Sequence, residues 1–381
     1  MLDPQARAQC LKTALAAMLM VLVWQFATVR FNYAGNWSGL FCTGSEVPLP
    51  PELNSSTARI PGLGYDGQYY RLVAHDPLLK QGYAPFADSV RHRWSRILIP
   101  VAAFTLAGGS HDRVDAAYIA LMLIFLGAGV YWSAVWLAGR GQPPWYGLIF
   151  LALPGALVSV DRMLLDGPLA ALFAAFLVYS DDRETNSPWP LLAVCAAAPL
   201  IRETGFVFCL AAAFTPIIRR SLWLRAAALA TALSGLVWTA WIAQQSAPLP
   251  IKPLLIPATG LVMRFFQPRP GAILAVTDFV ALAGMTACLV IGTMMLLRRQ
   301  ILWETAALAP FLLIGIAFGD PGYMQEPYGF VRPLAPLALA LSLHGIIDRN
   351  WIAIAAPLGL SVGVGVSFLW QIAGITRGLL R

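Results

Sequence analysis

The feature that most constrains this chain is a series of long apolar runs separated by short polar segments. A helix needs about 20 apolar residues to cross roughly 30 Å of hydrocarbon, where it must satisfy its own backbone groups. Runs near that length cover residues 14–29, 116–138, 145–160, 169–179, 223–243, 272–297, 301–318, 333–347 and 352–372. The pattern predicts an all-α polytopic membrane protein, one transmembrane domain over residues 1–381 with about 10 or 11 spans.

Composition supports this fold class and excludes several functions. The chain is 58% hydrophobic and 12% charged, whereas soluble domains contain about 25% charged residues. The net charge of +7 would raise the question of nucleic acid in a soluble protein, but the Lys and Arg residues lie in short clusters between apolar runs, as the positive-inside rule describes. We therefore predict no nucleic-acid partner. The five cysteines show neither CxxC nor Cys/His metal spacing, so no disulfide framework or metal centre follows from them.

Two ambiguous regions decide which side of the membrane each loop faces. Residues 97–109 are too few to span, so we expect a short or re-entrant helix. Residues 191–218 are interrupted by Arg202 and Glu203 and predict two short helices. We expect the protein to lie in the plasma (inner) membrane. With these choices its N-terminus is cytoplasmic. The residues that then face the cytoplasm are Arg7, Lys12, Arg140, Arg219, Arg220, Arg225, Arg298, Arg299 and Arg349. The same scheme places Arg377 and Arg381 outside.

This topology gathers five polar segments at the external face. They are the first external loop (31–96), the turn Asp161-Arg162 with Asp166, the pair Arg202-Glu203, the loop 244–271 with Lys252, Arg264 and Arg269, and the loop 320–332. Acidic and basic groups at one membrane face suit a site for an anionic, membrane-borne substrate.

Asp66 is the most conspicuous polar residue of the first external loop. Gly64 and Gly67 bracket it, and residues 68–79 read as a short amphipathic helix lying in the membrane interface. At the start of that helix, Asp66 could cap it. It could also act as a general base or a metal-binding carboxylate, and one aspartate can serve both purposes.

The sequence Gly-Tyr-Asp-Gly-Gln-Tyr-Tyr at 64–70 resembles a motif in a bacterial subset of the GT-C superfamily of membrane glycosyltransferases. This subset is linked to cell-surface glycopolymers. Three later stretches strengthen the resemblance: Arg-Trp-Ser-Arg-Ile-Leu-Ile-Pro at 93–100, Asp-Arg-Met-Leu-Leu-Asp-Gly-Pro at 161–168 and Ile-Arg-Glu-Thr-Gly at 201–205. The resemblance runs in order from the first span to about residue 335.

The resemblance implies transfer of a sugar from a polyprenyl-phosphate donor to a glycan, lipid or protein acceptor at the external (periplasmic) face, among membrane lipids. The enzyme would be a mannosyltransferase-like hexosyltransferase in cell-surface glycan or glycolipid assembly. The family's loop aspartate, which acts as base on the acceptor or organises the site, corresponds to Asp66, and the resemblance thus implies Asp66 as the catalytic residue. Many members carry two acidic residues adjacent or one apart, whereas Gly67-Gln68 follow Asp66 and the next carboxylates are Asp76 and Asp88. A divalent metal (Mg²⁺ or Mn²⁺) therefore stays open, and no cofactor is certain.

The remaining predicted site residues are substrate contacts. A lipid-phosphate donor leaves a phosphate behind, and Arg stabilises such charge bidentately. An equal alternative for Arg202 is a buried ion pair that fixes helix packing, and the alternative for Arg332 is an interfacial anchor. His92, between Arg91 and Arg93, suits a phosphate contact of raised basicity or a solvated basic run. The predicted substrate-binding set is Tyr65, Gln68, Tyr70, Arg96, Arg162, Asp166, Arg202, Glu203 and Arg332.

Two other functions are compatible with a polytopic chain. One is a transporter or a lipid or glycolipid flippase without transferase activity, and the other a non-catalytic scaffold. Transporters keep charged residues near the bilayer midplane and often contain repeated halves, whereas these charges cluster toward one face and no internal repeat is evident. A scaffold would leave the convergence of Asp and Arg unexplained. The sequence therefore favours the transferase.

Overall fold

The structure is a computed structural model that describes residues 2–181, 187–248, 256–267, 269–299, 302–317, 324 and 327–380. It is 76% helical, and its strands β1 (Thr43–Gly44) and β2 (Arg59–Ile60) have two residues each. In the described residues, 6 helices are long and apolar enough to cross a membrane: Pro4–Asn32, His111–Ala138, Leu222–Gln245, Ala272–Arg298, Tyr328–Ile347 and Trp351–Leu379. The prediction of an all-α multi-pass membrane protein is confirmed.

Helix α9 (Asp166–Ser180) lies at the centre of the bundle. A helix that is apolar all round is normally buried, and nearly every α9 residue is enclosed. It packs against α6 (His111–Ala138), α8 (Pro154–Arg162), α10 (Trp189–Ile201) and α19 (Ala335–Ile347). Since Asp166 is its first residue, α9 fixes a carboxylate at one end of the core.

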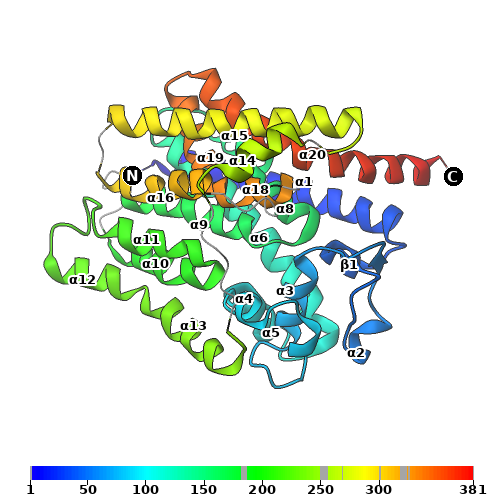
Figure 1. The fold of residues 1–381 in the computed structure, drawn as a ribbon. Coiled ribbons are helices and arrows are strands. Elements are labelled where there is room, and N and C mark those ends of the chain that lie inside the picture. Colours follow the sequence, from blue (N-terminus) through cyan, green and yellow to red (C-terminus); the bar gives the residue numbers. More distant parts are fainter. Residues whose placement is uncertain are drawn as a thin grey trace.

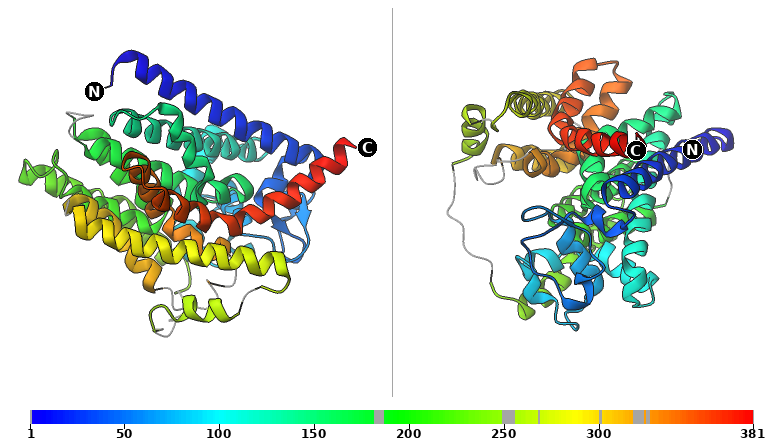
Figure 2. Two further views of the ribbon diagram at one scale, coloured as in Figure 1. Left: turned by 90° about the horizontal axis from the view of Figure 1, so that it is seen from above. Right: turned by 90° about the vertical axis from the view of Figure 1, so that its right-hand side faces the viewer.

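The two chain ends lie at opposite ends of the bundle (Figure 2). Helix α1 (Pro4–Asn32) begins at one end and finishes at the other, where the first external loop folds. The last helix, α20 (Trp351–Leu379), ends at the same end as that loop. Helix α15 (Ala272–Arg299) packs along α20 and also against α16 (Leu302–Ala317).

The first external loop forms a folded layer of short elements (Figure 1). In order they are η1 (Trp37–Phe41), β1, α2 (Pro51–Asn54), β2, α3 (Gly67–His75), η2 (Ala84–Phe86) and α4 (Val90–Trp94). Helix α3 differs from the expected interfacial helix because eight of its nine residues are buried in the protein. Arg71 explains this: its guanidinium lies 2.8 Å from Asp115 in α6, which ties α3 to the bundle.

The two ambiguous regions form short helices, as predicted. Residues 97–109 contain α5 (Leu98–Leu106). Residues 191–218 contain α10 and α11 (Phe206–Ala212), separated by Arg202 and η4 (Glu203–Gly205). The break is tight, because a Cβ on Gly205 would lie 2.2 Å from the backbone of Ala198. Only glycine fits there, so Arg202 and Glu203 are held between two helix ends.

The remaining short elements complete the bundle. Before α8 lie η3 (Pro144–Leu148) and α7 (Ile149–Ala152), with a bend of 62° between Pro144–Ala152 and Pro154–Arg162. Helices α12 (Leu222–Ala230) and α13 (Leu233–Gln245) are consecutive, and α14 (Thr259–Phe266) precedes α15. Helix α18 (Pro327–Val331) and η5 (Arg332–Leu334) lead into α19.

Labelling of single introduced cysteines tests whether the start of α1 and the first external loop lie on opposite sides of the membrane. Gln5 lies in the first turn of α1 and Ser45 lies in the first external loop, and both are exposed. We expect Ser45→Cys to react with a membrane-impermeant maleimide in intact cells, and Gln5→Cys to react only after permeabilisation, as the positive-inside rule requires. The native protein is a low-background control because its five cysteines are buried. Labelling of both variants from one side would contradict the arrangement.

Candidate functional site

The side chain of Asp66 does not cap α3. It makes no capping hydrogen bond; instead, its two oxygens accept hydrogen bonds from Arg93 Nη2 at 2.9 Å and Arg332 Nη1 at 2.6 Å. The capping role is therefore wrong for this side chain. Asp66 is 23% exposed while both arginines are 7% exposed, so the carboxylate lies between solvent and two buried cations.

Close backbone contact holds Asp66 in this position. The next residue, Gly67, lies so near the end of α8 that a Cβ there would approach the carbonyl oxygen of Arg162 to 2.2 Å. Gly64 has a φ of +70°, a conformation that glycine adopts without penalty. The two glycines thus let the start of α3 press against the bundle core.

A chain of ion pairs runs from the first external loop into the bundle. Arg93 pairs with Asp88 at 2.6 Å and with Asp66, and Arg332 joins Asp66 to Asp166 through its Nε at 2.8 Å. Arg202 completes the chain by pairing with Asp166. The exposed fraction of the carboxylates falls along it, from 42% at Asp88 through 23% at Asp66 to 1% at Asp166. We call these six residues the Asp66 network.

Arg96 forms a second cluster. Its guanidinium donates to both carboxylate oxygens of Glu203, at 2.5 and 3.0 Å, and to the hydroxyl of Tyr70. Arg96 is 2% exposed and Tyr70 is fully buried. These contacts join α3, the segment between α4 and α5, and the break between α10 and α11, so three predicted site residues meet.

Arg162 belongs to a third cluster, with aromatic neighbours. It pairs with Asp161 at 3.2 Å, and its guanidinium carbon lies 4.4 Å from the ring centre of Tyr65 and 3.8 Å from that of Tyr328. Arg332 lies 5.9 Å from the Tyr65 ring. Tyr65 therefore connects this cluster to the Asp66 network.

Several members of these clusters were not among the predicted site residues. Asp161 accepts hydrogen bonds from Tyr328, from Ser367 at 3.1 Å and from Gln371. Ser367 and Gln371 are four residues apart on α20, and polar residues on one face of an apolar span often mark functional positions. Arg93 lies three residues before Arg96, the spacing at which side chains on one helical turn are neighbours. These two spacings are the sequence signals that could have pointed to Ser367, Gln371 and Arg93.

Other expected residues have structural contacts. Gln68 is 2% exposed; its amide accepts from Gly44 N at 3.1 Å and donates to the carbonyl of Leu63 at 2.9 Å. Arg264 and Arg269 pair with Asp278 in α15, at 2.5 and 2.8 Å. Lys252 and residues 320–323 and 325–326 of the loop 320–332 lie outside the described residues.

The charges around Asp66 control its protonation. Burial alone would raise the pKa of the carboxyl, but Arg332 and Arg93 outweigh burial and hold the pKa well below its usual range. His92 behaves oppositely to the raised basicity considered for it, because burial, followed by nearby Arg96, lowers its pKa to about 4. Asp66 is therefore ionised and His92 neutral at pH 7.

The Asp66 network does not offer a place for a divalent metal. Asp66 and Asp166 share the guanidinium of Arg332, so a cation already lies where a metal bridging the two carboxylates would bind. Within the described part of the chain, no group of three or more His, Cys, Asp or Glu residues is arranged to hold a metal ion.

Removing the innermost carboxylate should be costly. In Asp166→Asn, Arg332 and Arg202 keep their charge in a buried place without that partner, which typically costs about 3–5 kcal/mol. We expect the free energy of unfolding in detergent to fall by that amount. The matched control, Asp88→Asn, removes a carboxylate that is 42% exposed and should change it by about 1 kcal/mol or less. Equal losses in the two variants would contradict the burial argument.

His92 should make stability depend on pH. An unfolded histidine titrates near pH 6.5, whereas the folded pKa is about 4. As pH falls from about 6.5 toward 4, the unfolded state takes up a proton that the folded state does not, so stability declines. We expect His92→Gln to show a shallower decline between pH 7 and 5 in thermal unfolding. An unchanged decline would exclude His92 as its source.

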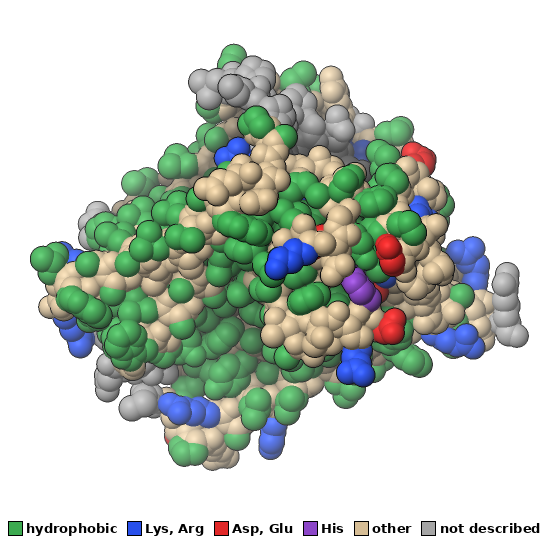
Figure 3. Space-filling view, turned by 90° about the horizontal axis from the view of Figure 1, so that it is seen from below, with side chains coloured by type: hydrophobic (Ala, Val, Ile, Leu, Met, Phe, Trp, Pro, Cys, Tyr) green, Lys and Arg blue, Asp and Glu red, His purple; other side chains and the backbone are tan. Residues whose placement is uncertain are grey.

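The site thus presents a partly exposed carboxylate, buried guanidinium groups and a tyrosine ring at one end of the helical bundle. Figure 3 shows charged and histidine side chains gathered in one region of the lower face, among apolar side chains. No family model, curated protein or solved structure matches this chain. Its function is therefore argued from the contacts of the site itself.

Proposed function

We propose that the protein is a membrane glycosyltransferase of the GT-C type, which transfers a sugar from a polyprenyl-phosphate donor to an acceptor hydroxyl at the external face. The observation that carries the proposal is the contact of Asp66 with Arg332. These residues are 266 positions apart in sequence, yet they put a partly exposed carboxylate and a buried guanidinium side by side at one end of a membrane bundle. A base and a phosphate-binding cation are the two groups that this reaction needs.

The arginines would bind the donor phosphate. Arg332 and Arg202 both contact Asp166, and Arg93 contacts Asp66 and Asp88. A phosphate offers the same kind of oxygen acceptor as a carboxylate, so it can replace a carboxylate on these guanidinium groups. The lipid tail of the donor would lie along the apolar helices. The headgroup would then reach the Asp66 network from the membrane side.

Phosphate binding would also activate Asp66. With two arginines bound, the pKa of Asp66 is held well below its usual range, and such a carboxylate is a weak base. A donor phosphate that draws Arg332 or Arg93 away removes part of this stabilisation and raises the basicity of the carboxylate. Asp66 would thus become a better base when the donor is bound.

The proposed reaction inverts the anomeric carbon. The acceptor oxygen forms a bond to that carbon while the bond from the carbon to the phosphate oxygen breaks. The bonding electrons leave with the phosphate, and Asp66 takes the acceptor's proton. The products are a glycoside and polyprenyl phosphate. Tyr65, beside Arg162 and Arg332, is placed to contact the sugar ring, as aromatic faces do.

The proposal also includes the finer topology. The four shorter apolar helices, Asp166–Ser180, Trp189–Ile201, Glu203–Ala212 and Trp303–Ala317, would complete about 10 or 11 crossings or re-entrant segments. The site would face the periplasm of an inner membrane. Cell-surface glycan or glycolipid assembly is the proposed setting, with the sugar of the mannose or related hexose class.

Release of polyprenyl phosphate tests the proposal. Purified protein in lipid would be incubated with polyprenyl-phosphate sugars and a mixture of glycan and lipid acceptors. We expect Asp66→Asn to lower the rate about 100-fold or more, since a general base contributes roughly 10²–10⁴-fold. Asp88→Asn, which removes the outer partner of Arg93, should keep most of the activity. Equal rates for Asp66→Asn and native protein would remove Asp66 from catalysis.

Arg332→Lys separates phosphate binding from a purely structural role. Lys keeps the charge but not the bidentate geometry, so we expect the KM for the donor to rise while kcat of the folded protein stays near native, and thermal unfolding measures the structural loss separately. Absence of release with every donor, combined with solute uptake or lipid transfer in proteoliposomes, would favour the transporter or flippase instead.

A further inference from the structure

A cavity of about 590 Å³ lies between two turns of the bundle. One wall comes from Gln142 and the η3–α7 segment after α6, and the other from the α19–α20 turn around Arg349. Helix α19 follows η5, which begins with Arg332, and it ends at Ile347 beside the cavity. The cavity and the Asp66 network therefore lie at opposite ends of α19. We call it the α19–α20 pocket.

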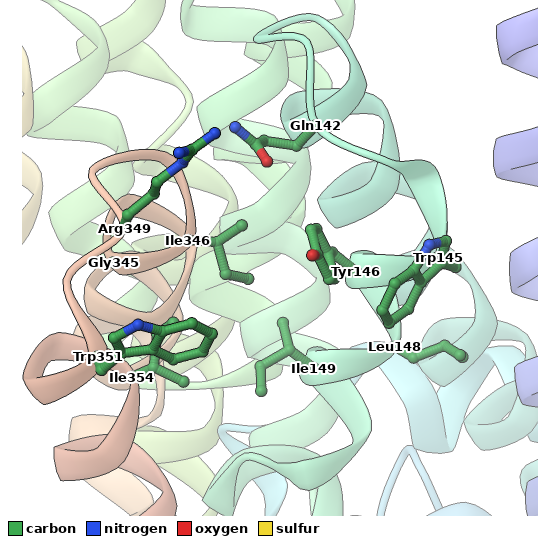
Figure 4. A pocket seen from close by; sticks show the side chains of 10 residues that line it. All are labelled: Gln142, Trp145, Tyr146, Leu148, Ile149, Gly345, Ile346, Arg349, Trp351 and Ile354. Carbon is green, nitrogen blue, oxygen red and sulfur yellow. The ribbon is translucent and has the colours of Figure 1, made fainter.

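The pocket has a polar end and an apolar remainder. Figure 4 shows the guanidinium of Arg349 and the amide of Gln142 pointing toward one another at the polar end. Among the described residues, the Arg349 side chain has no ion-pair partner and the Gln142 side chain no hydrogen bond. The apolar part is lined by Tyr146, Leu148, Ile149, Ile346 and Ile354.

Two tryptophans flank this apolar part. Trp145 is 59% exposed and Trp351 is 76% exposed, and they lie on opposite sides of the pocket (Figure 4). Trp351 is the first residue of the membrane-length helix α20, and tryptophan is enriched where spans meet the headgroup region. The pocket therefore lies at the level of the lipid headgroups, at the end of the bundle where α1 begins.

The turn that carries Arg349 is fixed in shape. Arg349 has a φ of +51°, which is uncommon for a residue other than glycine. The next residue, Asn350, accepts hydrogen bonds from the backbone of Ile352 and Ala353 and donates its own N–H to the carbonyl of Gly345 at 2.8 Å. The guanidinium is thus presented by a braced turn.

We propose that the α19–α20 pocket binds an anionic glycerophospholipid, with its phosphate on Arg349 and Gln142 and an acyl chain against the isoleucines. Basic pockets between membrane helices recognise anionic headgroups, and the volume lies within the usual range for ligand sites, roughly 300–1,000 Å³. No acidic side chain lines the pocket, so a choline headgroup finds no counter-charge there. The apolar walls distinguish a lipid from free phosphate.

Native mass spectrometry of the full chain in detergent tests the lipid site. The protein would be titrated with dioleoyl phosphatidylglycerol and, separately, dioleoyl phosphatidylcholine. One Arg near the headgroups is worth about a fivefold preference for the anionic lipid, and we expect the native protein to show it. Arg349→Gln should abolish the preference. Arg377→Ala is the matched control, because it removes an arginine from the other end of α20, and it should keep the preference.

Two further measurements test whether the acyl chain, and not only the phosphate, is bound in the pocket. Ile346→Trp fills the apolar part and should weaken binding of both lipids; thermal unfolding near the native temperature would confirm that it folds. Free glycerol phosphate should not displace bound phosphatidylglycerol. An unchanged preference in Arg349→Gln, an equal loss in Arg377→Ala, or full displacement by glycerol phosphate would each overturn the proposal.

Discussion

The contact on which the site depends is the double ion pair of Arg332, which donates to Asp66 at 2.6 Å and to Asp166 at 2.8 Å. It joins the first external loop, the central helix α9 and the start of α19. Burying a guanidinium is costly unless its partners are well placed, so the three segments must be in register for the bundle to be stable. The same contact makes Arg332 structural, and any phosphate that uses it must first compete with two carboxylates.

Much of the coarse architecture could be predicted from the sequence. Apolar run length identified the six described helices that are long enough to cross a membrane, because hydrocarbon thickness sets a physical minimum. The interruption at Arg202 and Glu203 indicated a helix break, since two charges are costly in lipid. The segregation of charges by side also grouped Asp66, Asp166 and Arg332 before any contact was visible.

The sequence could not show which polar side chains of the site contact one another. Gln371 meets Asp161 across 210 positions, a contact that depends on how α20 packs and not on any local period. Helix α3 looked interfacial because its pattern is amphipathic. The helix is buried instead because Arg71 has a carboxylate partner in α6, so even its polar face is enclosed. His92 misled similarly, since burial and the positive charge of Arg96 both lower its pKa.

The Asp66 network contains three carboxylates and three guanidinium groups, so its formal charges sum to zero. In the proposed reaction, an anionic donor would enter a site that is already electrically balanced, and the displaced carboxylates would stay close by. On departure of the phosphate product, each arginine would pair with its native carboxylate again without trapping a counterion. The protein's own acids would thus act as tethered competitors that limit affinity for the product and speed its exchange for a new donor.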